Sequence, residues 1–112
     1  MKGMALAKKL PTSLKVLGKT YQVKVVKPSS ANTLLRERDA AAGTSSSQDC
    51  LITINANQCT EQMKDTLIHE CIHMCDQTVC LDLSERQVHA LAGCFQALLS
   101  DNPQLASFIC SK

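Results

Sequence analysis

Hydrophobic and polar residues alternate over the first patterned stretch of the chain, from Ser13 to Lys27. Leucine, valine and tyrosine alternate there with lysine, threonine and glutamine, and the alternation is interrupted at Gly18-Lys19. β-Branched residues at a spacing of two on both sides of a glycine are typical of a β-hairpin. We therefore expect two antiparallel strands, ended by Pro28–Ser30. A short run rich in β-branched residues, Leu51–Asn55, predicts a further strand.

The period of the pattern changes after Thr60, where apolar residues begin to recur every three or four positions. They fill one half of a helical wheel, as an amphipathic helix requires: Met63, Leu67, Ile68, Cys71, Ile72, Met74 and Cys75. Thr60 or Asn57 is expected to cap this helix. Ser84 and Gln87 have the spacing of a capping box, which predicts the start of a second helix. That helix is expected to bury Val88, Leu91, Ala92, Phe95, Leu98 and Leu99.

The remaining stretches complete the predicted fold. A short last helix is expected from Pro103 to Ile109, because proline suits a first helical turn. Residues 1–12 lack a period and predict a flexible arm, residues 31–42 suit either a short helix or a weak strand, and residues 43–49 predict a polar loop. Strands first and helices second indicate an α+β domain spanning residues 1–112. A small mixed or antiparallel sheet would pack on the first long helix, followed by the second long helix and the short C-terminal one.

Composition and charge narrow the classes of partner. The net charge is only +2 and the chain has three aromatic residues, Tyr21, Phe95 and Phe108. A nucleic-acid-binding surface is usually denser in basic residues and carries stacking aromatics, so no nucleic-acid partner is expected. No apolar run approaches the ~18 residues of a membrane span, and Met1–Lys9 lacks the apolar centre of a signal peptide. We therefore expect no membrane partner and a location in the cytoplasm.

Seven cysteines are many for 112 residues, but their number is odd and no Cys-x-x-Cys pair occurs. With no secretion signal, a disulfide framework is disfavoured. Most are expected to be small buried hydrophobic residues, with Cys71 and Cys75 on the apolar side of the first helix. A second metal site made of thiolates and a redox-sensing cysteine protein are the alternatives.

Candidate chemistry lies in the middle of the first long helix, at His69-Glu70-Cys71-Ile72-His73. Two histidines four residues apart lie on one face of a helix, so both imidazoles can reach one Zn²⁺ ion. Glu70 lies beside them and can accept a proton from a zinc-bound water, whose pKa the metal lowers to about 7. Because HExxH is short and also occurs by chance, the alternative is a pair of surface histidines on an ordinary helix. The helical pattern, the preceding strand and the following helix favour the metal site.

Zinc needs a third protein ligand if one position is to stay open for water. Glu85 and His89 are four residues apart on the same flank of the second helix. If the two helices pack through their apolar faces, that flank can meet the histidine pair. Glu85 is the preferred ligand, and its alternative role is a surface carboxylate favoured by the helix dipole. His89 is the competing ligand, or a catalytic donor to the oxyanion that forms during attack.

The stretches Thr66–Met74 and Leu83–Ala92 resemble small phage- and prophage-encoded HExxH metallopeptidase-like proteins. They are similar to the minimal gluzincins and to the ImmA/IrrE group, in which a glutamate ligand on the next helix follows HExxH. The resemblance implies that Glu85 is the third ligand and that a sheet of three or four strands packs on the active-site helix. It also implies that Leu51–Asn55 is an edge strand, which would pair with an extended substrate.

The motif and the resemblance predict a zinc-dependent endopeptidase that hydrolyses peptide bonds of a protein substrate, with Glu70 activating a zinc-bound water. The alternative is a zinc-stabilised regulatory or binding protein of phage type without efficient catalysis. Neither a long C-terminal subdomain nor a tyrosine downstream of the motif is present, so we expect a narrow cleavage or a latent enzyme. A monomer or weak oligomer is expected, in the host cytoplasm if the protein is phage-encoded.

Overall fold

The computed structural model describes residues 10–27 and 42–112, and the described part contains four strands followed by three helices. The strands are β1 (Ser13–Val16), β2 (Lys19–Val26), β3 (Gly43–Ser46) and β4 (Leu51–Asn55). The helices are α2 (Thr60–Val79), α3 (Glu85–Asp101) and α4 (Pro103–Cys110). The expected α+β class, with a small sheet and then two long helices and a short one, is confirmed. Most of the predicted arm and of the ambiguous stretch 31–42 lies outside the described residues.

β1 and β2 form the expected hairpin, in which Ser13 pairs with Gln22 and Val16 pairs with Lys19. The connecting residues Leu17 and Gly18 have φ angles of 52° and 88°. Positive φ at both central residues matches the right-handed twist of a hairpin, and glycine adopts it without a steric cost. The turn therefore lies one residue earlier than the Gly18-Lys19 centre of the sequence pattern.

The sheet has the strand order β1-β2-β4-β3 and is mixed, because β4 runs parallel to β2 and antiparallel to β3. Two predictions are wrong here. β4 is an interior strand rather than the edge strand that the resemblance implied, and Gly43–Ser46 is a strand rather than part of a polar loop. Short polar strands lack the apolar alternation that predicts a strand, and they occur at sheet edges, where fewer side chains need burial.

Gly43 permits the close approach of β3 to its neighbours. A Cβ at this position would overlap the carbonyl oxygen of Thr53 on β4 and lie 2.9 Å from Thr66 Cγ2 on α2. Only glycine leaves room for both the β4 backbone and the α2 side chain. β3 is thereby drawn against the helix that carries the histidine motif.

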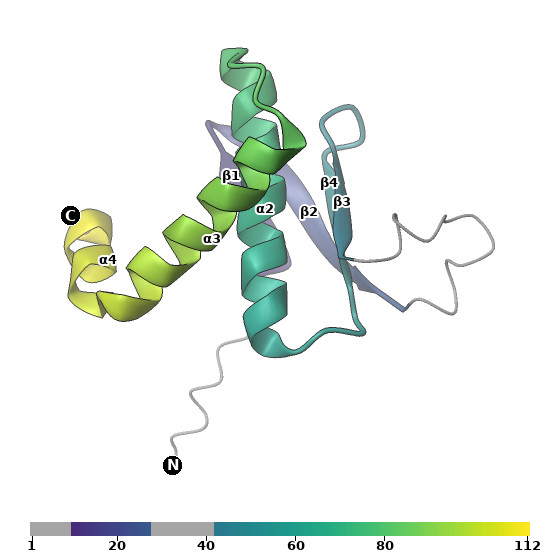
Figure 1. Cartoon of the computed structure of the whole chain (residues 1–112). Helices are drawn as coiled ribbons and strands as arrows, with labels where there is room; N and C mark the ends of the chain where they lie inside the picture. Colours follow the sequence, from purple (N-terminus) through teal and green to yellow (C-terminus); the bar gives the residue numbers. More distant parts are fainter. Residues whose placement is uncertain (1–9, 28–41) are drawn as a thin grey trace.

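α2 lies along one face of the sheet, and α3 packs on α2 (Figure 1). The core between sheet and helix consists of buried residues from β1, β2, β4 and α2: Val16, Tyr21, Val23, Ile52, Ile54 and Met74. Cys71 and Cys75 pack against this cluster, as expected for the apolar side of the helix. Leu10 also packs there, so the end of the predicted flexible arm is held against the core.

The helix starts agree with the sequence in one case and not in the other. At α3 the backbone N–H of Gln87 donates to Ser84 Oγ (3.1 Å), and that of Ser84 donates to Gln87 Oε1 (2.8 Å), so the predicted capping box is confirmed. At α2 the N-cap is Cys59, whose N–H donates to Gln62 Oε1. Neither Thr60 nor Asn57 caps this helix, because the N-cap position lies one residue before Thr60 and two residues after Asn57.

The burial predicted for α3 is correct only near its start. Val88 and Ala92 are fully buried, whereas Leu91, Phe95, Leu98 and Leu99 are each more than a third exposed. α2 covers the first part of α3 and not the rest, because the two helices cross and diverge (Figure 1). In the part of the chain that the structure describes, no helix is long and apolar enough to cross a membrane.

The cysteines are less buried than expected. All seven are free and lie among the described residues, and four of them are exposed: Cys59, Cys80, Cys94 and Cys110. The prediction that most are buried is therefore wrong. The exposed ones lie at helix ends or on α3 and α4, where none of the described strands or helices covers them.

Candidate metal centre

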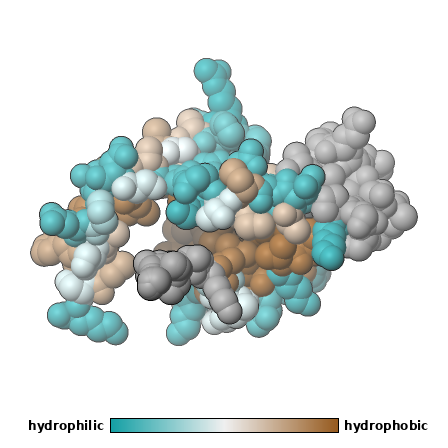
Figure 2. All heavy atoms as spheres, turned by 90° about the horizontal axis from the view of Figure 1, so that it is seen from below, coloured by the Kyte–Doolittle hydropathy of each residue, from teal (hydrophilic) through white to brown (hydrophobic). Residues whose placement is uncertain are grey.

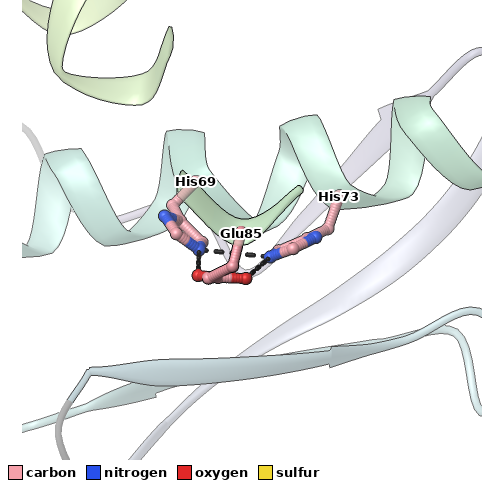
Figure 3. A group of neighbouring side chains, drawn as sticks. All are labelled: His69, His73 and Glu85. Atoms are coloured by element: carbon pink, nitrogen blue, oxygen red, sulfur yellow. Dashed lines mark hydrogen bonds and ion pairs between the residues drawn. The ribbon is translucent and has the colours of Figure 1, made fainter. Parts of the chain in front are cut away.

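Three of the predicted site residues converge at one point between α2 and α3 (Figure 3). The Nε2 atoms of His69 and His73, one helical turn apart, are separated by 3.2 Å. Glu85, the first residue of α3, places Oε2 2.7 Å from His69 Nε2 and Oε1 2.9 Å from His73 Nε2. These donor atoms all lie within 4.8 Å of one another. The two helices therefore bring together two imidazoles and one carboxylate that are separated by up to 16 positions along the chain.

The link between the helices places Glu85 at this point. α2 ends where Cys80 takes a left-handed conformation (φ 59°) and donates its N–H to the carbonyl of Asp76. The carboxylate of Asp76 accepts the N–H of Leu83 at 3.2 and 3.3 Å, which folds the link back toward α2. Ser84 then caps α3, so Glu85 begins the helix beside the histidine pair.

The donor set fits a zinc ion. Imidazole nitrogens and a carboxylate oxygen are common zinc ligands, and donors about 2.0–2.2 Å from a tetrahedral ion lie about 3.3 Å apart. Each Glu85 oxygen lies against a different histidine, and one donor atom from each of the three residues lies within 4.8 Å of the others, so small side-chain rotations would let them share an ion. The histidine side chains are 14% and 27% exposed and that of Glu85 is 69% exposed. The trio thus lies at the rim of the core, where a fourth ligand could reach an ion from solvent.

Glu70 is buried beside the trio and has a partner that the sequence analysis missed. Its Oε1 accepts a hydrogen bond from Ser45 Oγ on β3 at 2.5 Å, and the residue is only 6% exposed. A buried carboxylate needs such a donor, since an unpaired one is costly. Ser45 lies in a run of three serines with no periodic signal, so only the pairing of β3 with β4 could have revealed it.

His89 lies near the donor group without belonging to it. Its ring centroid is 6.1 Å from that of His69, one turn of α3 beyond Glu85. Among the described residues, the group able to hold a metal comprises His69, His73 and Glu85. The geometry therefore favours Glu85 over His89 as the third ligand. The role of His89 as an oxyanion donor stays a prediction.

A cavity of about 550 Å³ opens over these side chains. Its walls come from β3 and the residue before it, from α2 and from the start of α3. Three carboxylates line it (Asp65, Glu70 and Glu85), and no described lysine or arginine does. Such a lining favours a cation. The edge of the sheet, the helix motif and the third ligand share this one cavity.

Cys71 follows Glu70 but faces the core rather than the cavity. Burial, and then the neighbouring Cys75 and Glu70, raise the pKa of its thiol to about 11. At neutral pH the thiol therefore stays protonated, and a protonated thiol is a poor metal ligand and a poor nucleophile. This favours a packing role for Cys71 over a redox role.

The sequence motif and the folded geometry agree on a His-His-Glu trio with a carboxylate beside it. Sequence reasoning missed the β3 wall of the cavity, which supplies Gly43, Thr44 and Ser45. Comparisons with protein families, with curated proteins and with solved structures gave no match to this chain, so its function is argued from the site itself.

Proposed function

We propose that this protein is a zinc-dependent endopeptidase that hydrolyses peptide bonds of a protein substrate. The observation that carries the proposal is the convergence of His69, His73 and Glu85 in one cavity with Glu70. We also propose that it acts in the cytoplasm. If the protein is phage-encoded, as its resemblance to small phage-type HExxH proteins implies, this is the cytoplasm of the host cell.

The residues of the chain have distinct roles in this proposal. His69, His73 and Glu85 would hold the zinc ion, which when bound supplies a Lewis acid for a peptide carbonyl and for an attacking water. Glu70 takes the proton of that water and passes it to the leaving amine. Ser45 orients the Glu70 carboxylate through its hydrogen bond. His89, which also lines the cavity, would donate to the developing oxyanion.

β3 offers a way to align the substrate. It ends the sheet in the described part of the chain, and an extended peptide can add to such an edge through main-chain hydrogen bonds. Residues Gly43–Ser45 also line the cavity, so a peptide paired with β3 would pass the trio. This moves the proposed substrate-pairing strand from Leu51–Asn55 to Gly43–Ser46.

The proposal is tested by incubating the zinc-loaded protein with a library of quenched fluorescent peptides, with and without a chelator. We expect cleavage that the chelator abolishes and that added zinc restores. A protein that binds one zinc per chain but cuts no peptide would contradict the endopeptidase and favour a zinc-stabilised binding or regulatory protein.

The metal ligands can be identified by elemental analysis of purified variants. His69→Ala, His73→Ala and Glu85→Ala are each expected to weaken zinc binding by at least about a hundredfold, because each leaves only two protein donors. His89→Ala is the matched control and should retain one zinc per chain. Retention of zinc by Glu85→Ala together with its loss from His89→Ala would make His89 the third ligand.

Ser45→Ala is expected to lower the turnover of a cleaved peptide by roughly ten- to a hundredfold, since a hydrogen bond to a charged group contributes about 1.5–3 kcal/mol. The zinc content should not change. Ser46→Ala removes a hydroxyl from the same strand whose partner is the N–H of Asp49, outside the cavity, and serves as the control. Ser45→Thr keeps the hydroxyl and should restore turnover. Equal losses in both alanine variants would assign Ser45 a purely structural role.

A further inference from the structure

The second half of α3 and the helix α4 expose an apolar surface that the proposed function does not use. We call it the α3–α4 face, and it consists of Leu91, Phe95, Leu98, Leu99, Phe108 and Ile109. Phe108 is 77% exposed and Ile109 is 65% exposed. Figure 2 shows brown and tan residues among polar ones at the left end of the molecule, which these helices form. Exposed apolar side chains that cluster in this way usually mark an interaction site.

The face is exposed because the second half of α3 extends beyond the end of α2 on which its first half packs. Val88 and Ala92 are buried, and further along α3 Gln96 donates to the carbonyl oxygen and the side chain of Glu61. Glu61 lies in the first turn of α2, so α3 beyond this point extends past the helix that supports it. The sequence pattern correctly marks an apolar face here, and no described part of the chain covers it.

The face also lacks charge. Asp101 is the only charged residue between Ala90 and Cys110. Leu91, Phe95 and Leu98 follow one another at spacings of four and three, which places them in one stripe along the helix. A helix surface of this kind is normally buried against another helix.

The area of the face is close to what a stable interface requires. If a leucine, isoleucine or phenylalanine side chain offers on the order of 200 Å², the six exposed fractions correspond to roughly 600 Å². The face is therefore at the upper end of the range for the largest apolar patch on a typical monomer, which is about 300–600 Å². One partner in a standard protein interface buries about 800 Å². With the polar rim that surrounds any such patch, the α3–α4 face reaches the size of one half of an interface.

We propose that this face is covered by the same face of a second copy, so that the protein is a homodimer paired through α3 and α4. A twofold interface brings each surface against itself, which requires that it not repel its own copy. A helix pair that carries Asp101 as its single charge between Ala90 and Cys110 meets that condition and favours an apolar partner over a charged one. The proposal does not depend on bound zinc or on catalysis.

The dimer leaves the metal centre open. α4 and the end of α3 lie on one side of α2, and β3 lies on the other (Figure 1). The cavity that contains the histidine pair faces β3 and not α4. Each protomer would therefore keep its own cavity accessible to a substrate.

Sedimentation of the full-length protein over a range of concentrations, under reducing conditions, tests the proposal. The wild type should have about twice the chain mass of 12.2 kDa. Phe95→Glu and Phe108→Glu should each weaken the dimer by at least about tenfold, since each places a charge opposite its own copy. Leu81→Glu introduces the same charge at an apolar residue that is 62% exposed in the α2–α3 link, and it should leave the dimer intact. A wild type that stays monomeric at every concentration, or a dimer that both phenylalanine variants leave unchanged, overturns the proposal.

Thiol labelling gives a second readout, whose first measurement uses the wild type alone. Cys94 is exposed and lies on α3 three residues after Leu91 and four before Leu98, beside the stripe they form, whereas Cys80 is exposed at the end of α2. Raising the wild-type concentration should slow maleimide labelling of Cys94 and leave that of Cys80 unchanged. In Phe108→Glu the Cys94 rate should no longer depend on concentration. Equal rates for Cys94 at low and high wild-type concentration would contradict the dimer even if the variants failed to fold.

Discussion

Glu70→Gln is expected to reduce peptide cleavage by about a thousandfold while the protein keeps one zinc per chain. A positioned general base contributes on the order of 10²–10⁴ to a rate, and an amide cannot accept the proton of the attacking water. Glutamine has the shape of glutamate, and its carbonyl oxygen can still accept the hydrogen bond from Ser45. The buried site therefore keeps its packing and loses only its base. Turnover and zinc content should be measured on the same preparation.

Glu61→Gln is the matched control for this experiment. It removes one negative charge from the same helix, at a side chain that is 68% exposed and outside the metal-centre cavity. Its turnover should stay within about twofold of the wild type, as is usual for a surface substitution. If Glu70→Gln and Glu61→Gln cleaved equally well, Glu70 would not be the base. Loss of zinc from Glu70→Gln would instead indicate that Glu70 supports the metal.

The parts of the site that lie on helices could be predicted from the sequence because their geometry is local. The spacing of His69 and His73 fixes both on one face of α2, whatever surrounds the helix. The capping box at Ser84 fixes where α3 starts, and therefore makes Glu85 its first residue. Only the meeting of the two helices had to be assumed, and the apolar faces that surround Val88 and Ala92 account for it.

The sheet side of the site could not be predicted, because it depends on contacts between distant residues. Ser45 reaches Glu70, 25 positions away, only because β3 pairs with β4 in a register that sets Ser45 opposite Ile52. Nothing in a run of serines indicates that pairing. Gly43, which lets the strand approach Thr53 and Thr66, resembles any other glycine in a polar stretch.

α3 illustrates a different limit. Its apolar residues recur at helical spacing and do lie on a helix, yet Leu91, Phe95 and Leu98 are exposed. The spacing of apolar residues indicates which face of a helix needs to be buried, but it does not indicate which surface will cover that face. In the described structure α2 provides that surface for the first part of α3. For the rest we propose a second copy of the chain.

Removal of zinc is expected to lower the melting temperature by roughly 15 °C. A ligand at 1,000 times its dissociation constant stabilises the folded state by about 4 kcal/mol, and each kcal/mol corresponds to about 4 °C for a domain near this size. The effect should be large here because only Val88 and Ala92 of α3 are fully buried. Coordination by His69, His73 and Glu85 would tie the start of that helix to the middle of α2. Thermal unfolding with zinc and with a chelator, at one fixed protein concentration, measures the difference.

Two variants separate this stabilisation from a general effect of metal ions on the protein. His73→Ala should melt at the same temperature with zinc and with chelator, because only two donors of the trio remain. His89→Ala, which alters a neighbouring histidine outside the trio, should keep the full difference. Zinc that stabilised His73→Ala as much as the wild type would bind elsewhere, on the exposed thiols for example. α3 would then have to stay packed on α2 without a metal, and the burial of Val88 and Ala92 alone provides little free energy for that packing.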